Sequence, residues 1–85
     1  MLRQNFPNPF NPTTRIPYSL SERARVMLTV YDVAGREIST LIDRNEEAGL
    51  HFAEFNASHL ASGAYLYRLQ VGGRVVDVKK ALLMR

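Results

Sequence analysis

His51 and His59 are the only histidines in this sequence and its best candidates for binding a metal ion. A zinc site needs three or four converging ligands, often with cysteine thiolates among them. The chain contains no cysteine, and its histidines lack the His-Glu-x-x-His spacing of zinc peptidases. We therefore predict no metal site, and we expect His51, which lies in a predicted strand, to make structural hydrogen bonds.

The carboxylates and hydroxyls show no catalytic pattern either. Glu46 and Glu47 are adjacent in a predicted loop, whereas a glycosidase needs two carboxylates that face each other across a cleft. No serine lies in a Gly-x-Ser-x-Gly motif. Gly72-Gly73 does not precede a helical stretch, as a phosphate-binding loop would. Asn56-Ala57-Ser58 matches the N-glycosylation sequon in form only. We therefore predict that the chain has no catalytic or cofactor-binding residue and that it is not an enzyme.

The composition limits the domain count and the classes of partner. The 85 residues suffice for one small domain, and 46% of them are hydrophobic, which is enough for a core. The net charge is +3, and the longest basic run is the pair Lys79-Lys80. A nucleic-acid-binding protein usually gathers its basic residues on one stripe with aromatic residues between them. We therefore predict no nucleic acid partner.

The sequence shows neither a membrane-spanning stretch nor an N-terminal signal peptide. No stretch approaches the roughly 18 apolar residues of a membrane-spanning helix, so we predict that this is not a transmembrane protein. Met1 leads directly into Leu-Arg-Gln-Asn, which is not a secretory signal peptide. If the domain is secreted, we expect it to be a fragment of a larger protein.

Alternation of apolar and polar residues predicts six strands and no helix longer than one turn. Asp32 to Gly35 suits a type I turn that closes with a left-handed glycine, and Gly72-Gly73 suits a two-residue hairpin. The apolar phase changes between Ile38 and Leu41, which indicates a bulge. Leu60 is expected to plug the core. Together these signals predict an antiparallel sandwich. The predicted strands cover residues 13–20, 26–31, 36–43, 50–56, 64–71 and 74–83, with a polar connection over 44–49.

Residues 2–13, the lead-in segment, contain three prolines and two phenylalanines. Each proline fixes its own backbone and favours an extended residue before it, so the segment reads as a rigid, kinked approach to the first strand. Phe6 and Phe10 are expected to pack onto the domain, because exposing each costs about 1.5–3 kcal/mol. A structural clasp is the interpretation that the physics favours, and a recognition element is the alternative.

Five motifs in series carry a family resemblance. They are Leu2-Arg-Gln-Asn-Phe-Pro-Asn-Pro-Phe-Asn-Pro-Thr-Thr14, Ile16-Pro-Tyr-Ser-Leu20, Val30-Tyr-Asp-Val-Ala-Gly-Arg36, Ala48-Gly-Leu-His51 and Leu60-Ala-Ser-Gly-Ala-Tyr65. In this order and spacing they resemble the type A C-terminal sorting domains of type IX secretion cargo, from Leu2 to Arg85. The resemblance implies a small antiparallel immunoglobulin-like β-sandwich of about seven strands, of Greek-key type. Phe55 stands where the family often has tryptophan.

The resemblance also implies a function and partners. The domain would address N-terminal cargo domains of its parent protein to the type IX secretion machinery of Bacteroidetes-type bacteria. The cargo would travel through the periplasm and across the outer membrane, to be secreted or held at the cell surface. A sortase-like cell-surface peptidase would usually remove the domain, by a cut upstream of Leu2 or close to it.

Recognition is expected at three stretches that match recurring motifs of the family, with Arg85 as the favoured basic end. A receptor could add a strand to the edge of the last strand, and deleting residues 79–85 would then stop export without unfolding the domain. The alternative is that Val76, Val78, Leu82 and Leu83 are simply core, and the two interpretations are compatible because alternate residues of a strand face opposite ways. The other candidate function is a structural or carbohydrate-binding immunoglobulin-like module, related in its motifs to flagellar hook-capping domains. The expected recognition residues are Asn8, Pro9, Gly63, Tyr65, Lys79, Lys80, Leu82, Leu83, Met84 and Arg85.

Overall fold

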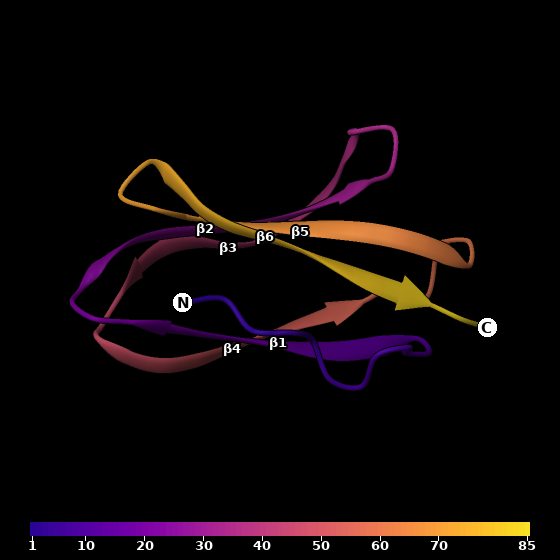
Figure 1. The fold of residues 1–85 in the computed structure, drawn as a ribbon, viewed down its shortest axis with the longest axis horizontal. Helices are drawn as coiled ribbons and strands as arrows, with labels where there is room; N and C mark the ends of the chain where they lie inside the picture. The colour runs from indigo at the N-terminus through magenta and orange to yellow at the C-terminus, as the bar shows by residue number, and fades with distance from the viewer.

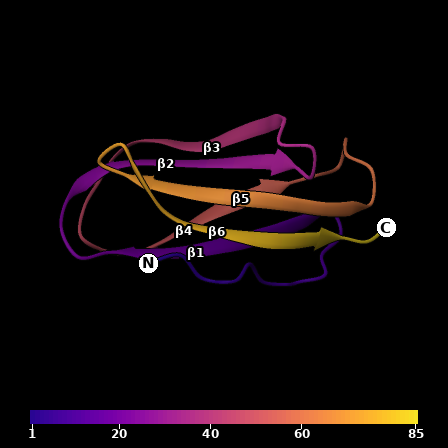
Figure 2. The ribbon, with the colours of Figure 1, turned by 45° about the horizontal axis from the view of Figure 1, so that its top comes forward.

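The computed structural model describes all residues from Met1 to Arg85 as two packed antiparallel sheets without a helix. β1 and β4 form a two-stranded sheet, and the other strands form a four-stranded sheet in the order β3-β2-β5-β6. Figure 1 shows the sheets as two layers, and Figure 2 shows the order of the larger one. The predicted all-β sandwich is thus confirmed. The strands are β1 (Thr13–Leu20), β2 (Ala24–Asp32), β3 (Glu37–Glu46), β4 (Gly49–Asn56), β5 (Gly63–Val71) and β6 (Arg74–Leu83).

The core lies between the sheets and follows the period of two along each strand. In β4, for example, Ala53 and Phe55 are buried whereas Phe52 and Glu54 are exposed, because successive side chains point to opposite faces. Leu60 packs partly buried against this core, as expected. The core residues are Leu2, Phe10, Ile16, Tyr18, Leu20, Val26, Leu28, Val30, Ile42, Ala53, Phe55, Ala57, Tyr65, Tyr67, Leu69, Ala81 and Leu83.

Both predicted turns form. The Gly35 N–H donates to the Asp32 carbonyl at 3.0 Å, and Gly35 takes a φ of 87°, which few residues other than glycine adopt. The Asp32 side chain accepts the backbone N–H groups of Ala34 and Arg36. The backbone N–H of Arg36 is the largest cause that holds the pKa of Asp32 below its ordinary value. Val71 pairs with Arg74, so Gly72 and Gly73 are the two-residue hairpin.

The third strand is longer than the sequence suggested. Leu28 pairs with Ile42 and Thr29 with Thr40, which leaves Leu41 as the extra residue of the predicted bulge. β3 then continues to Glu46, because Ala24 at the start of β2 still pairs with it. The predicted polar connection over residues 44–49 was therefore wrong, and only residues 47 and 48 join β3 to β4. Polar side chains are tolerated in this part of β3 because it is exposed at a sheet edge.

The strand count is six and not about seven as the resemblance implied, and the lead-in segment pairs with β1 and β6 through isolated bridges only. Leu2 pairs antiparallel with Tyr18, Phe6 pairs antiparallel with Arg15, and Phe10 pairs in parallel with Leu83. The segment therefore runs beside β1 and then crosses to the edge of β6. Its three prolines lack N–H groups, so the pairing consists of isolated bridges and not a continuous strand.

The two phenylalanines of the lead-in segment have opposite environments. Phe10 is 2% exposed and its ring lies 5.8 Å from that of Phe55, as expected. Phe6 is 75% exposed, so the expectation that it packs onto the domain was wrong. Phe6 lies opposite Arg15 in the pairing, and residues directly opposite share one face of a sheet. Since Arg15 faces solvent, Phe6 does too.

Candidate recognition surface

The lead-in segment and the last strand are joined along their backbones. The Leu82 N–H donates to the side-chain oxygen of Asn8 at 2.9 Å. The Phe10 N–H donates to the Leu82 carbonyl at 2.9 Å, and the Met84 N–H donates to the Phe10 carbonyl at 3.0 Å. These bonds place the predicted stretch Asn8-Pro9 against the predicted stretch at the C-terminus. They also close the outer edge of β6 at residues 82–84.

The third predicted stretch lies at the same end of the sandwich. Gly63 pairs with Leu83 at the start of β5. Tyr65 is buried, its ring meets Phe55 edge-on at 6.5 Å, and its hydroxyl donates to the Ala61 carbonyl at 2.7 Å. The structure thus brings all three stretches to one end, which we call the assembled end. Figure 1 shows the C-terminus beside the loop between β4 and β5 there.

Arg85 fastens that loop. Its guanidinium donates to the carbonyl oxygens of Ala57 and Ser58, both at 2.7 Å, and to that of Leu60 at 2.9 Å. Its backbone N–H donates to the Ser62 hydroxyl at 3.1 Å. An arginine can serve several carbonyls at once because its five donors are fixed in one plane. The basic residue at the end of the chain therefore has an intramolecular role.

A buried polar network anchors the lead-in segment, and sequence reasoning missed it. The Tyr67 hydroxyl accepts the Asn5 N–H and donates to the Arg3 carbonyl, both at 2.8 Å. The Asn5 amide donates to the Thr14 hydroxyl at 3.0 Å. Burial raises the pKa of Tyr67 to about 12. The available signal was a tyrosine on the inward face of β5, because a buried hydroxyl needs a partner.

The expected recognition residues divide by exposure. Asn8, Pro9, Lys80, Met84 and Arg85 are exposed, so a partner can touch them. The Lys80 carbonyl also accepts a bond from the Gln4 side chain at 2.7 Å. Gly63 is exposed as well, whereas the side chains of the other expected residues are partly or fully buried: Tyr65, Lys79, Leu82 and Leu83.

The open part of β6 is poorly suited to an added strand. The pairing shifts between Leu69 and Gln70, which leaves Val76 as a bulged residue. The Val78 N–H donates to the Asp77 carboxylate at 2.8 Å, so this edge donor is already satisfied. Val76 and Val78 are about half exposed, so the interpretation that they are core was wrong, whereas Leu83 is core. A partner would therefore contact the side chains of β6 more readily than its backbone edge.

At the end of the sandwich opposite the assembled end, the titratable side chains of Tyr18, Glu46 and His51 interact with other groups of the domain. The Tyr18 hydroxyl donates to Glu46 at 2.5 Å, and this bond is the largest cause that lowers the pKa of Glu46. Burial raises the pKa of Tyr18 well above its ordinary value. His51 stacks on Tyr18 at 5.4 Å and its Nε2 lies 2.7 Å from the Glu47 carbonyl, the structural role expected of it. No three His, Cys, Asp or Glu side chains gather closely enough to hold a metal ion.

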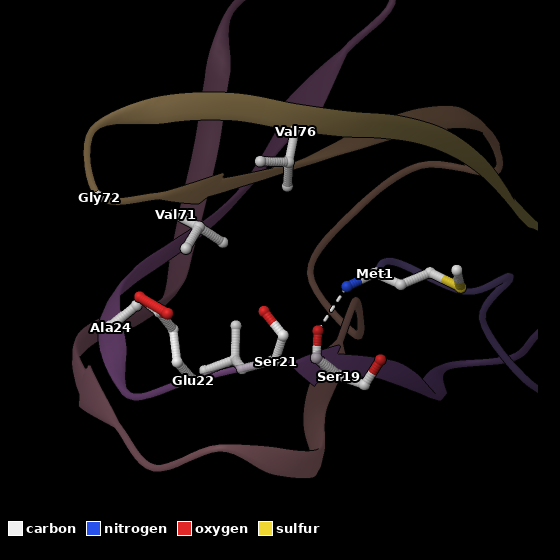
Figure 3. A pocket seen from close by; sticks show the side chains of 9 residues that line it. Met1, Ser19, Ser21, Glu22, Ala24, Val71, Gly72 and Val76 are labelled. Carbon is white, nitrogen blue, oxygen red and sulfur yellow. Dashed lines mark hydrogen bonds between the residues drawn. The ribbon is translucent and has the colours of Figure 1, made fainter.

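An open hollow of about 370 Å³ lies where the chain begins, between the start of the lead-in segment and the hairpin of β5 and β6. Figure 3 shows the amino group of Met1 hydrogen-bonded to the Ser19 carbonyl at its rim. Glu22 is the one acidic side chain in its lining, with Ser19 and Ser21 as the hydroxyls. Glu22 makes no hydrogen bond to either hydroxyl, as the base of a hydrolase would to its nucleophile.

A comparison with models of known protein families identifies the family of the whole chain. Residues 4–84 match the model described as "Secretion system C-terminal sorting domain". The chain belongs to this family. It is a C-terminal sorting signal for type IX secretion, and the match includes residues 4–13 of the lead-in segment, the β4–β5 loop and β6. Comparisons with curated proteins and with solved structures gave no significant match.

Membership of this family indicates what the sorting domain interacts with and where its signal leads. It acts with the type IX secretion machinery, and the signal implies export to the cell surface or beyond. Nothing in the structure favours a carbohydrate-binding or structural accessory module. None of its secondary structure is a helix that could cross a membrane.

Proposed function

We propose that the secretion machinery reads the sorting domain as a folded unit, at the assembled end. The observation that supports this is the set of hydrogen bonds by which Asn8 and Phe10 hold Leu82 and Met84. A linear peptide signal would need no such bonds. A preformed surface binds at a lower entropic cost than a segment that must first be ordered.

In this proposal the exposed and the buried residues of the assembled end have different roles. Asn8, Pro9, Lys80 and Met84 contact the receptor. Tyr65, Leu83 and the Arg85 side chain position them, through packing or through bonds within the domain. Lys79 lies 3.9 Å from Asp77 and is partly buried, so we assign it to the support as well.

The cargo domains precede the sorting domain in the parent protein, and the sorting domain itself catalyses nothing. The chain begins beside Ser19, at the opposite end of β1 from the assembled end. A sortase-like peptidase that cuts upstream of Leu2 therefore acts away from the surface that the machinery holds. The cargo crosses the periplasm and then the outer membrane before this cut.

The proposal is tested with a periplasmic reporter fused to the domain in a type IX-competent bacterium. The intact domain sends the reporter outside the cell. Asn8→Ala, Lys80→Ala and Met84→Ala each retain most of it in the periplasm, whereas Glu22→Ala at the opposite end does not. Thermal unfolding of each purified domain confirms that the variants fold. Normal export of all three folded variants would refute the assignment. Deleting residues 79–85 is a weaker test, because Ala81 and Leu83 belong to the core.

A further inference from the structure

The outer face of the four-stranded sheet carries an arginine that has no acidic partner within the domain. Arg68 alternates in β5 with the buried residues Tyr67 and Leu69, so its side chain points away from the core. Its register partners, Thr29 on β2 and Val78 on β6, are uncharged. Arg68 is partly buried and makes none of the ion pairs of the domain, whereas a buried charge is usually paired.

The hydrogen bonds of the Arg68 guanidinium are incomplete as well. Its Nε is buried and has no hydrogen-bond partner within the domain. One terminal nitrogen donates to the Gln70 side-chain oxygen, over a long 3.3 Å. The guanidinium carbon lies 4.8 Å from the centre of the Tyr31 ring, a contact that leaves every N–H unsatisfied. A carboxylate can accept from Nε and a terminal nitrogen together, so the group gains hydrogen bonds by turning from the ring toward one.

The charges of this face leave its β5–β6 half positive. Lys80 is the second cation there, and it is exposed and makes no ion pair. On the β2–β3 half, Arg25 and Asp43 form an ion pair at 2.6 Å. The other carboxylate of the face, Glu37, lies on β3 at the far edge, where it accepts a bond from the Thr40 hydroxyl at 3.4 Å. The outward side chains of β5 and β6 therefore include two cations and no carboxylate.

Apolar side chains surround the two cations. Val75 and Val78 on β6 are 53% and 46% exposed, and Leu66 on β5 is partly exposed. The pairing places Val78 beside Arg68 and Leu66 beside Lys80. An exposed apolar patch of this kind is typical of a contact surface. A small free carboxylate would leave the patch in water, so the face favours a protein surface that has both acidic and apolar side chains.

Two other occupants fit this face less well. A second copy of the domain, related by a two-fold axis, would place the same patch on both sides of the contact. Arg68 and Lys80 would then face cations. Recognition of anionic lipids usually takes a cluster of about four or more basic residues, and this half of the face has two.

We infer that the outer face of β5 and β6 binds an acidic, partly apolar surface of a protein of the secretion machinery, with one of its carboxylates on Arg68. A second carboxylate meets Lys80, and apolar side chains cover Val75 and Val78. Lys80 joins this face to the assembled end, where the receptor is proposed to contact it. The identity of the partner therefore rests on the proposed function, whereas its acidic character rests on Arg68.

The reporter fusion tests the charge of the partner. Arg68→Glu lowers the extracellular fraction of the reporter by about tenfold or more, because like charges then oppose each other. Arg74→Glu is the matched control. It makes the same charge change in an exposed residue beside the β5–β6 hairpin, remote from Lys80, and it leaves export intact. Thermal unfolding of the purified domains confirms that both variants fold. Equal export by the two variants would overturn the inference.

A carbodiimide cross-link tests the same contact without reversing any charge. The reagent joins an amine to a carboxylate with no spacer, so only groups in direct contact react. Arg68→Lys supplies an amine at position 68. In cells that export this fusion, mass spectrometry finds position 68 and Lys80 joined to aspartate or glutamate of another protein. Lys79 is the control, because it lies 3.9 Å from Asp77 and should join only that residue.

The contrary outcomes are distinct. A folded Arg68→Lys domain without a cross-link at position 68 would overturn the inference. So would binding of the purified domain to phosphatidylglycerol vesicles that Arg68→Glu abolishes, since lipid would then be the occupant. Normal export of Arg68→Glu, with Asn8→Ala and Met84→Ala retained, would overturn the inference and keep the proposed function. Retention of Arg68→Glu, with Asn8→Ala, Lys80→Ala and Met84→Ala exported, would refute the assembled end as the receptor surface and keep the acidic partner at Arg68.

Discussion

The side-chain oxygen of Asn8 accepts the backbone N–H of Leu82 at 2.9 Å, across 74 positions of sequence. This bond and the two between Phe10 and β6 make the first and last segments of the chain one surface. The lead-in segment, which the sequence predicts to be a rigid, kinked approach to the first strand, is therefore part of the C-terminal end of the domain. Changes in the lead-in segment should therefore affect β6.

Phe10 and Phe6 should respond very differently to truncation. Phe10→Ala removes a buried ring that packs on Phe55, so we expect a loss of about 3–5 kcal/mol in the free energy of unfolding. Phe6→Ala removes an exposed ring and should change it by less than about 0.5 kcal/mol. Urea unfolding of the two variants measures both values. Similar losses would show that the lead-in segment does not cross from β1 to β6.

Tyr67→Phe should loosen the start of the lead-in segment. It leaves the Asn5 N–H and the Arg3 carbonyl without their partner, at a cost of about 1–3 kcal/mol. Faster amide exchange at Asn5, with the core of β2 unchanged, is the expected signature.

The wild-type Tyr67 also predicts an alkaline transition. Its pKa is about 12 in the fold against an ordinary 10, so the folded state favours the neutral phenol. This contribution to stability is complete below pH 10 and is lost as the pH rises toward 12. Tyr67→Phe should lack that part of the alkaline loss. Identical alkaline unfolding of both proteins would contradict the burial of this hydroxyl.

Tyr18→Phe should act through Glu46. Without the phenol, the pKa of Glu46 rises toward its ordinary value of 4.5, which a titration of its carboxyl signal by NMR detects. Because the folded-state pKa is lowered, the associated stability is present above pH 4.5 and lost as the pH falls through the folded-state pKa. We expect the variant to lose about 1–2 kcal/mol at pH 7. The difference from the wild type should shrink at pH 3, and a constant difference would contradict this account.

Arg85→Ala should release the loop between β4 and β5. Three carbonyls lose their donor, and amides in residues 57–62 should exchange faster. The effect on unfolding should be about 1 kcal/mol or less, since the side chain is exposed. Arg85→Lys is the matched control that keeps the positive charge. It should also release the loop, because one ammonium cannot reproduce the planar set of donors. Full protection of the loop in the alanine variant would show that the Arg85 side chain does not hold the loop.

The strands and turns were predictable because their signals are local. Alternation along residues 64–71 and the glycines at 35, 72 and 73 determine their own conformations, and the structure confirms them. The extension of β3 to Glu46 was missed because polar residues such as Asn45 are held there by pairing with β2 and not by their own propensity.

The path of the lead-in segment needed the structure. Phe6 and Phe10 are the same residue type four positions apart, and only the pairing opposite Arg15 and Leu83 separates their environments. The partner of the Tyr67 hydroxyl lies 62 positions earlier, a distance over which sequence spacing carries no signal. Within the expected recognition set, exposure likewise follows from register, which separates exposed Lys80 from buried Leu83.

The central claim is that the export signal is the folded assembled end and not the last strand alone. Its most direct test compares the extracellular fraction of one periplasmic reporter carrying either the whole domain or only residues 74–85. Export by the whole domain, with the short segment leaving the reporter in the periplasm, is the predicted result. Equal export by residues 74–85 would contradict the claim, because that segment lacks Asn8, Phe10 and every contact that they make with β6.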